Sequence, residues 1–132
     1  MTPKRAYLLD ASALLAALFG EPGGEVVTGI IDGCAIHAVN LAETVRKMLQ
    51  TGVPVEETEA ILGSLDLDVN SILSPKEAWA AGRLAFSARD FGLSLGDCVC
   101  LSVAAHAGQK VVTADRRWSE IDGLGVEVLQ VR

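Results

Sequence analysis

The feature that most constrains the fold of this chain is a regular alternation of short apolar runs with longer helical segments. The runs at 6–9, 34–39, 110–113 and 126–131 are rich in apolar residues and too short for helices, and a shorter alternating run lies at 67–69. Nearly continuous apolar runs are typical of strands that are buried on both faces of a sheet. Strands that alternate with helices predict an α/β fold, a three-layer sandwich in which helices flank a central parallel sheet of about four or five strands.

Two of the predicted helices begin with capping boxes. Asn40, with Glu43 three residues later, predicts a helix that begins at Asn40 and ends near residue 51. Ser74, with Glu77 three residues later, predicts another that runs to about Phe91. Further helices are expected over 11–19, 25–31, 54–65 and 93–107, with a short one at 116–118.

The helix that begins after Ser74 has a predicted core side. Its members share helical spacings of three, four and seven and are Ala78, Trp79, Gly82, Ala85 and Phe86. We interpret the two aromatic residues as core or as a subunit interface, in preference to a platform for stacking bases.

The size and charge of the chain exclude some classes of protein. At 132 residues, half of them hydrophobic, residues 1–132 predict a single domain with one sizeable core. The net charge of −6 argues against a protein that binds nucleic acid by overall electrostatic attraction, because neutralising phosphates needs a basic face. Any contact with nucleic acid is therefore expected to be local or mediated by a metal ion.

The cysteines and the start of the chain indicate a compartment. Cys34, Cys98 and Cys100 are an odd number of cysteines in apolar surroundings, so we expect buried free thiols in a reducing cytosol. The N-terminal residues have no pattern of a signal peptide, and no apolar stretch reaches the length of a membrane span. A soluble protein of the cytoplasm is the expectation.

Acidic residues recur where the predicted strands end. Asp10 follows the first strand, Glu43 lies one turn into the helix after the second, and Asp115 follows the strand at 110–113. In a parallel α/β sheet, functional groups gather at the carboxyl ends of the strands.

Asp97 can be placed at the same edge from the lengths of two elements. The helix from Asp97 to Ala107 runs about 15 Å away from its start at 1.5 Å per residue. The strand that follows returns about 13 Å at 3.3 Å per residue. Asp97 and Asp115 are therefore expected at the same level.

Four carboxylates at one edge predict a cation site. Without a cation they would repel one another and take up protons. Oxygen ligands without a cluster of His or Cys suit Mg²⁺ or Mn²⁺ rather than zinc. Such a site can activate a bound water and stabilise a leaving oxygen, which suits hydrolysis of a phosphodiester.

Four blocks of the sequence carry a resemblance to a known family. They are Leu8-Leu9-Asp10-Ala11-Ser12-Ala13-Leu14, Asn40-Leu41-Ala42-Glu43, Leu93-Ser94-Leu95-Gly96-Asp97-Cys98 and Val112-Thr113-Ala114-Asp115. In order and approximate spacing they resemble the four acidic motifs of PIN-domain ribonucleases. The size of the chain and the third block resemble, more narrowly, VapC toxins of toxin–antitoxin pairs.

The resemblance implies an endoribonuclease that depends on Mg²⁺ or Mn²⁺, is usually a homodimer and is held inactive by a VapB-like antitoxin. It implies that Asp10, Glu43, Asp97 and Asp115 bind the metal and carry out catalysis. Ser12 and Thr113 would be the hydroxyls beside them. Cys98 stands where such proteins often have Ala, a change between small apolar residues.

Each of these acids also has a purely structural interpretation. Asp10 fits a turn at a strand end, Glu43 and Asp97 fit helix caps, and Asp115 fits the cap of the next helix. Asn40 is expected to cap its helix, with a contact to the site as the alternative.

The basic residues near the acids have two interpretations as well. Arg46 and Lys47 follow Glu43, and Arg116 and Arg117 follow Asp115. They could hold RNA phosphates at the rim of the site, or they could be solvated or paired with acids.

Two other classes of function compete with the ribonuclease. A phosphatase of the haloacid-dehalogenase type would use Asp10 as a covalent nucleophile, but that chemistry calls for a second Asp two residues later, where Ser12 stands. A non-catalytic module, either a receiver or a PIN-like scaffold, is the other. A receiver needs paired acids early in the chain, and a scaffold normally loses some of the four acids that are present here.

Overall fold

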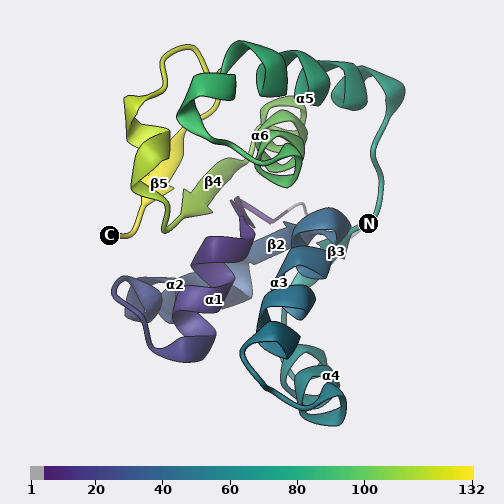
Figure 1. Cartoon of the computed structure of the whole chain (residues 1–132), viewed down its shortest axis with the longest axis vertical. Helices are drawn as coiled ribbons and strands as arrows, with labels where there is room; N and C mark the ends of the chain where they lie inside the picture. Colours follow the sequence, from purple (N-terminus) through teal and green to yellow (C-terminus); the bar gives the residue numbers. More distant parts are fainter. Residues whose placement is uncertain (1–4) are drawn as a thin grey trace.

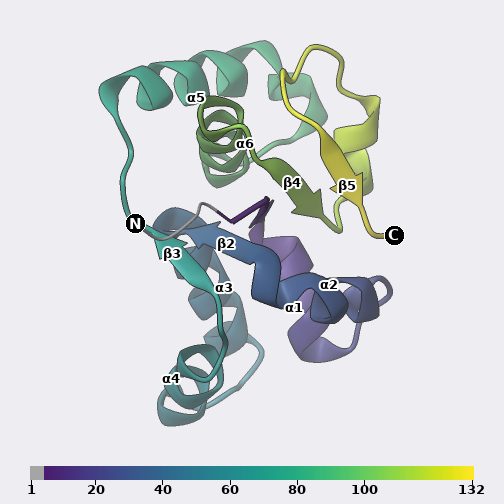
Figure 2. The ribbon, with the colours of Figure 1, turned by 180° about the vertical axis from the view of Figure 1, so that it is seen from behind.

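The computed structural model of the chain describes residues 5–132 and contains one parallel sheet with helices on both faces. The strand order is β3-β2-β1-β4-β5, and every neighbouring pair is parallel (Figures 1 and 2). The strands are β1 (Tyr7–Leu9), β2 (Cys34–His37), β3 (Asp68–Asn70), β4 (Lys110–Thr113) and β5 (Val128–Gln130). The predicted α/β architecture with a parallel sheet is confirmed.

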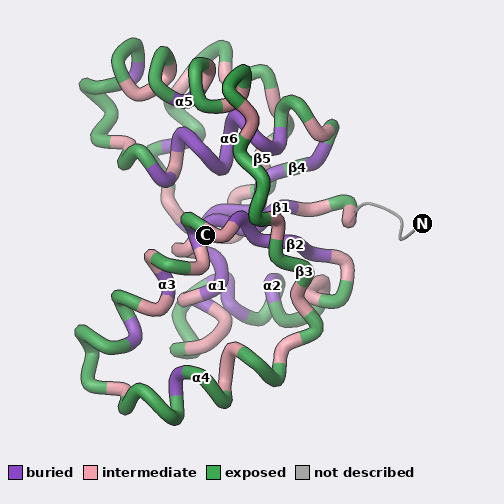
Figure 3. The backbone as a smooth tube through the Cα atoms, turned by 90° about the vertical axis from the view of Figure 1, so that its right-hand side faces the viewer, coloured by how far each residue is buried: buried purple, intermediate pink, exposed green. Residues whose placement is uncertain are grey.

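The helices form the two outer layers. They are α1 (Ala11–Phe19), α2 (Gly24–Ile30), α3 (Ala38–Gln50), α4 (Val55–Gly63), α5 (Pro75–Ser87) and α6 (Leu95–Ala107), with short 3₁₀ turns η1 (Ile31–Gly33), η2 (Arg89–Phe91) and η3 (Arg116–Glu120). Figure 3 shows α6 and then α5 stacked on one face of the sheet, and α1, α2 and α3 with α4 on the other.

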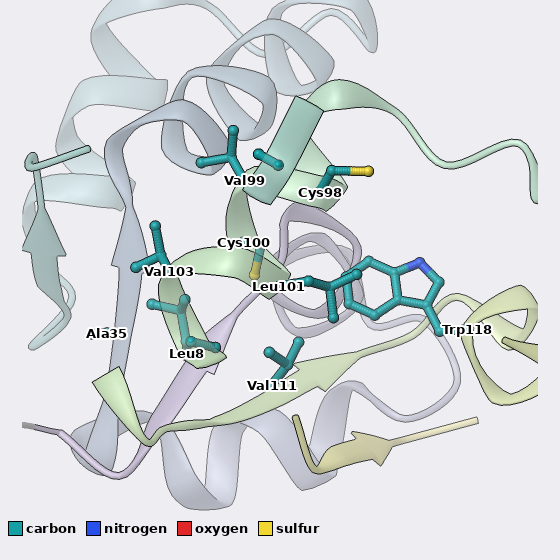
Figure 4. Packing of buried hydrophobic residues seen from close by; sticks show 11 residues of the cluster. Leu8, Ala35, Cys98, Val99, Cys100, Leu101, Val103, Val111 and Trp118 are labelled. Carbon is teal, nitrogen blue, oxygen red and sulfur yellow. The ribbon is translucent and has the colours of Figure 1, made fainter. Parts of the chain in front are cut away.

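Helix α6 is the centre of the first core cluster. Its residues from Cys98 to Ala104 are all buried, because this part of the helix lies between the sheet and α5. Leu8 and Val111 of the sheet contribute to the same cluster, and Figure 4 shows the indole of Trp118 beside Leu101 at one end of it. A helix packed on two sides in this way is a rigid support for whatever its N-terminus carries.

The second core cluster lies on the other face, between the sheet and α1. Leu9, Ile36 and Val112 come from three adjacent strands and pack with Leu14 of α1. Helix α2 closes tightly on α1 at Gly24, where an added Cβ would lie 2.2 Å from a carbonyl oxygen of α1. This contact explains why Gly is needed where α2 begins.

The start of α3 differs from the sequence prediction. The helix begins at Ala38, and its N-cap is His37, whose Nδ1 accepts the backbone N–H of Val39 at 3.1 Å. Asn40, predicted as the cap, lies inside the first turn and is completely buried, so the capping box with Glu43 was wrong. Because His37, the last residue of β2, supplies this acceptor nitrogen, the helix starts two residues earlier than predicted.

Helix α5 confirms its predicted start but only a small part of its predicted core side. Ser74 accepts the N–H of Glu77 at 3.1 Å, and the Glu77 carboxylate accepts that of Ser74 at 2.9 Å. Trp79 and Phe86, however, are 75% and 70% exposed. Helix α6 packs against a neighbouring stripe that contains the buried Ala81 and the partly buried Leu84 and Ala85, so Ala85 is the one member of the predicted set that joins this core.

Two further predictions concern the state of the cysteines and the absence of a membrane-spanning segment. Cys34, Cys98 and Cys100 are free and buried, as predicted. Among the described residues, no single helix is long and apolar enough to cross a membrane; α1 and the α2–η1 segment together meet the length and composition, with a bend of 102° between them.

Candidate active site at the carboxyl edge of the sheet

Four acidic residues from four different elements meet at the carboxyl edge of the sheet. Asp10 links β1 to α1, Glu43 lies one turn into α3, Asp97 is in the first turn of α6, and Asp115 follows β4. The charge of Asp97 interacts with those of Asp10, Glu43 and Asp115. The predicted gathering of the four acids is therefore present, with Asp97 at its centre.

The carboxylate of Asp10 is fixed by three donors. It accepts the N–H of Ala13 at 2.8 Å, which makes it the N-cap of α1. The hydroxyl of Ser12 donates to it at 2.8 Å and that of Thr113 at 2.5 Å. The same two hydroxyls accept the backbone N–H groups of Ala114 and Asp115, both at 3.0 Å. Ser12 and Thr113, predicted as auxiliary residues, thus join the ends of β1 and β4 around one carboxylate.

Burial makes Asp10 a weak acid. Its pKa is raised to about 7, chiefly by desolvation; the charge of Asp97 also raises it, whereas the hydrogen bonds from Thr113, Ala13 and Ser12 lower it. The carboxyl group therefore holds a proton at mildly acidic pH. A positive charge beside it would favour the ionised form.

Glu43 lies in a gap that glycine keeps open. An added Cβ on Gly96 would lie 2.2 Å from Oε1 of Glu43, so any side chain at this point of α6 would displace the Glu43 carboxylate. That Oε1 atom is buried and has no hydrogen-bond partner. Desolvation and then the charge of Asp97 raise the pKa of Glu43, whereas Arg46 lowers it.

Asn40 connects the same two helices beneath the acids. Its Nδ2 donates to the carbonyl oxygen of Gly96 at 3.4 Å, and its Oδ1 is buried without a partner. The alternative assignment of Asn40, a contact with the site, therefore describes it better than the helix cap.

Asp97 both caps its helix and faces the other acids. The hydroxyl of Ser94 accepts the N–H of Asp97 at 3.0 Å, and the Asp97 carboxylate accepts the N–H of Ser94 at 2.9 Å. Desolvation raises the pKa of Asp97, and the nearby charge of Asp115 contributes to the rise. The capping box orients a carboxylate that still lies among like charges.

Asp115 differs from the other three acids because it has a cationic partner. Arg117 donates from Nε at 3.0 Å and from a terminal nitrogen at 2.5 Å, which lowers the pKa of Asp115. Arg117 also donates to the carbonyl oxygen of Gly92 at 2.9 Å, so it ties η3 to the loop before α6.

The four predicted RNA-contacting residues are placed differently from one another. Arg117 is paired with Asp115, and Arg46 is close enough to Glu43 to affect its pKa. Arg116 is exposed beside a cavity of about 480 Å³ that Ser12 and Asp115 also line. Lys47 is exposed on α3, and no contact places it with the described acids.

Arg132 also lies near the site, although it is not among the residues predicted from the sequence. Its Nε donates to the carbonyl oxygen of Ala114 at 3.0 Å, and it lines the same cavity as Arg116. The signal was available, because the last parallel strand must end at the carboxyl edge and Arg132 follows that strand.

The chemistry of the acids fits a hard divalent cation. All the donors are oxygens, burial raises the pKa of three of the acids, and one buried oxygen of Glu43 lacks a partner. As the side chains lie, no three His, Cys, Asp or Glu residues within 5–132 converge closely enough to hold a metal ion. The carboxylates of Asp97 and Asp115 are turned toward Ser94 and Arg117, so a cation would have to compete with these contacts.

Comparisons with known proteins agree with the fold. The fold is similar to the crystal structure of DNA-bound VapBC from Salmonella typhimurium, with a TM-score of 0.70 and 17% identity over 96% of this chain and 98% of that one. It is also similar to VapBC2 from Rickettsia felis bound to a promoter DNA fragment (TM-score 0.69, 17% identity, 96% and 98% covered) and to VapBC-5 from Mycobacterium tuberculosis (0.58, 20%, 96% and 99%). At these identities the likeness is one of fold.

Sequence comparison gives the family directly. No curated protein sequence matches the chain significantly. The sequence model of the PIN domain, however, matches residues 7–124, a range that contains all four acids and every strand but the last. The chain therefore belongs to the PIN domain family.

Proposed function

We propose that this protein is an endoribonuclease that depends on Mg²⁺ or Mn²⁺, hydrolyses RNA phosphodiester bonds and is the toxin of a toxin–antitoxin pair. The observation that carries the proposal is the set of carboxyl groups around Asp97, three of which have pKa values raised by burial. A cation among these carboxyl groups would favour their ionised forms and offset the repulsion between them. Membership of the PIN domain family, whose nucleases generally use divalent metals, supports the same function.

Each acid has a stated role in this proposal. Asp10, Glu43, Asp97 and Asp115 would hold the cation, which would supply an activated water and stabilise the departing oxygen. Ser12 and Thr113 keep the Asp10 carboxylate in place. Gly96 leaves the space that the Glu43 carboxylate occupies. The fold thus holds close together four carboxylates that would otherwise repel one another and move apart.

RNA would be held by a few cations at the rim. Arg116 and Arg132 line the cavity that reaches Ser12 and Asp115, and Arg46 is near Glu43. With a net charge of −6, the protein needs such local contacts, since its overall charge repels phosphate. Arg117 is engaged with Asp115, so its release would accompany cation binding.

The proposed partners are an antitoxin and a second copy of the chain. Similar folds occur in structures of VapBC and of a toxin–antitoxin complex, which supports a VapB-like antitoxin. The proposed setting is the cytoplasm. We expect the antitoxin to present an Arg or Lys into the acidic edge, in competition with the cation. A homodimer is the proposed assembly.

The state of Asp10 counts against a phosphatase that uses it as a nucleophile. The carboxyl group is 1% exposed, accepts three hydrogen bonds and has a pKa raised to about 7. A carboxylate that must attack a phosphate needs to be ionised and accessible.

The test is cleavage of a panel of structured RNAs with and without Mg²⁺ or Mn²⁺. Asp10→Asn and Asp97→Asn are compared with wild type, and Glu59→Gln, on the exposed part of α4, is the matched control. We expect metal-dependent cleavage by wild type and by the control, and a loss of at least ~100-fold in both site variants. Unchanged cleavage in the two site variants would disprove the site assignment.

The toxin role has a separate test. Expression of the wild-type chain in bacteria should arrest growth, and Asp97→Asn should not. A short neighbouring reading frame encoding a DNA-binding protein should restore growth when it is expressed together with the toxin. Cleavage in vitro without growth arrest would retain the nuclease and reject the toxin.

A further inference from the structure

The indole N–H of Trp118 is a buried hydrogen-bond donor close to the acidic edge. Trp118 belongs to η3, the 3₁₀ turn whose N-cap is Asp115, and the residue is 1% exposed. Its ring packs in the first core cluster beside Leu101 (Figure 4). The indole nitrogen, however, makes no hydrogen bond to any of residues 5–132. A buried donor destabilises any state in which it lacks an acceptor.

The carboxylate of Asp115 is the acceptor on which this donor acts. Arg117 makes the largest contribution to the lowered pKa of Asp115, and the side chain of Trp118 lowers it further. The backbone joins the same two residues, because the N–H of Trp118 donates to the carbonyl oxygen of Asp115 at 3.4 Å. The indole N–H therefore lies near the Asp115 carboxylate, although the two groups do not complete a hydrogen bond.

Arg117 occupies both oxygens of that carboxylate. Oδ1 of Asp115 accepts the backbone N–H and the Nε–H of Arg117, both at 3.0 Å. Oδ2 accepts Nε at 3.0 Å and a terminal nitrogen at 2.5 Å. The orientation of the carboxylate toward Arg117 accounts for the unfilled donor of Trp118. The side chain of Arg117 is about half exposed, so water and other charges can compete for it.

The backbone at Asp115 is held more firmly than its side chain. The N–H of Asp115 donates to the hydroxyl of Thr113 at 3.0 Å, and the carbonyl oxygen of Ala114 accepts Nε of Arg132 at 3.0 Å. Loss of the Arg117 contact would therefore let the carboxylate rotate while the backbone stays in place. A rotation is enough to exchange one donor for the other, because both donors come from the same short turn.

We propose that Trp118 is a positioning residue: its indole N–H replaces Arg117 as the donor to Asp115 when that arginine is released, and so fixes the carboxylate for cation binding. The inference rests on the proposed cation site, for which Arg117 and the cation compete. A hydrogen bond from an outer partner orients a metal-binding carboxylate and strengthens its binding. An arginine in this role would leave a positive charge beside the cation, whereas an indole is neutral.

The first experiment follows the indole N–H signals of isotope-labelled protein by NMR, without any metal. The chain has two tryptophans, and Trp79→Phe assigns the signal of Trp118. In Arg117→Ala the Trp118 signal should move downfield, because the freed Asp115 carboxylate accepts its proton. Adding Asp115→Ala to this variant should remove the shift. Arg116→Ala, at an exposed neighbour, is the control and should leave the signal at its wild-type position.

The second experiment measures Mn²⁺ affinity by calorimetry. Trp118→Phe keeps an aromatic ring without the N–H and should weaken Mn²⁺ binding about tenfold. Val126→Ala removes apolar packing from the same core cluster and no polar group, so the affinity should stay within about twofold of wild type. In an Asp115→Ala background, Trp118→Phe should also change the affinity less than about twofold, since its effect passes through that carboxylate.

A closer isostere covers the case in which Trp118→Phe is unstable. In Trp79→Phe, biosynthetic replacement of the remaining tryptophan by benzothienylalanine substitutes sulfur for the N–H in a ring of nearly the same size. The packing beside Leu101 is kept, so thermal melting should be close to that of Trp79→Phe. Mn²⁺ binding should weaken as it does in Trp118→Phe.

The possible failures are distinct. An indole signal that does not move in Arg117→Ala, or that moves equally when Asp115 is also replaced, would overturn the role of Trp118 and leave the cation site. Equal weakening of Mn²⁺ binding by Trp118→Phe and Val126→Ala would do the same, because the ring would then act through packing alone. A wild type that binds no Mn²⁺ would overturn the cation site and the positioning role together, and only then does the proposed function fail as well.

Discussion

The carboxyl edge of the sheet and the outer face of α5 depart from the usual placement of residues in opposite ways. At the edge, carboxyl groups are wholly or partly buried; on α5, aromatic rings are exposed. The cost at the edge is electrostatic, since charges lose water and face like charges. The cost on α5 is hydrophobic, since apolar surface remains in water.

This difference indicates what each region is built to bind. A cation balances the desolvated carboxylates, whereas another apolar surface covers the rings. The acidic residues at the edge come from four segments that lie far apart in the sequence, whereas the aromatic residues on the outer face of α5 come from a single helix. Changes at the two regions should therefore have separable effects.

The largest expected effect separates the two regions by activity. Asp97→Asn should lower metal-dependent RNA cleavage at least ~100-fold, because the amide keeps an acceptor for Ser94 but loses the charge. Trp79→Gln, assayed on the same RNA, should change cleavage less than about threefold for each folded copy. Equal losses in the two variants would show that the two regions are not independent.

The next effect concerns stability and pH. Since burial raises the pKa of Asp10 to about 7 from 3.8, the native state binds more protons than the unfolded state between these values, and stability falls as pH rises through that window. Asp10→Asn removes this loss. The variant should therefore be more stable than wild type at pH 8 by on the order of 2–4 kcal/mol, and should show little or no gain at pH 4.

Denaturant unfolding at the two pH values, without divalent metal, measures this difference. Addition of Mn²⁺ at pH 8 should stabilise wild type more than Asp10→Asn. A wild type whose stability does not change from pH 4 to pH 8 relative to the variant would show that the buried carboxyl costs nothing.

A smaller effect tests whether the edge depends on backbone shape. Gly96→Ala should displace the Glu43 carboxylate and weaken Mn²⁺ binding with little change in stability, because the new methyl group meets the movable end of that side chain. Gly29→Ala in α2, where nothing lies within 4 Å, is the matched control and should be neutral or stabilising by up to about 1 kcal/mol. Chemical denaturation and Mn²⁺ binding compare the two, and similar Mn²⁺ affinities for both would contradict the tight fit at Gly96.

The smallest effect concerns the one acid that already has a cationic partner. Arg117→Ala should tighten Mn²⁺ binding by a few fold, because the Asp115 carboxylate is then free to take part. Arg116→Ala, next to it and unpaired with Asp115 among the described contacts, should leave Mn²⁺ affinity unchanged. Weaker Mn²⁺ binding in Arg117→Ala would mean that the arginine positions Asp115 and does not compete for it.

Several parts of the fold followed from local signals. The alternation of apolar runs and helices predicted the parallel sheet, and the Ser74–Glu77 pair predicted the start of α5 because a capping box is formed by adjacent residues. The four acids were predictable because each follows a strand or opens a helix, and parallel strands end at one edge.

Other parts of the fold, such as the start of α3, could not be predicted from neighbouring residues in the sequence. Asn40 has the side chain of a good cap, but His37 lies two residues before Val39 and accepts its N–H, so the expected cap became a buried contact with Gly96. Both residues could cap a helix, and the path of the chain from β2 decided between them.

The sequence by itself determined the order of the elements and the identity of the acids, since both depend on spacing along the chain. Only the tertiary structure decided which acids interact electrostatically, which one is paired with arginine, and which side of α5 packs against α6. Trp79 and Phe86 have the same helical periodicity as a core stripe, but α6 packs against the neighbouring stripe around Ala81. Periodicity predicts that a helix has an apolar face, and the packing of the rest of the chain determines whether that face is covered.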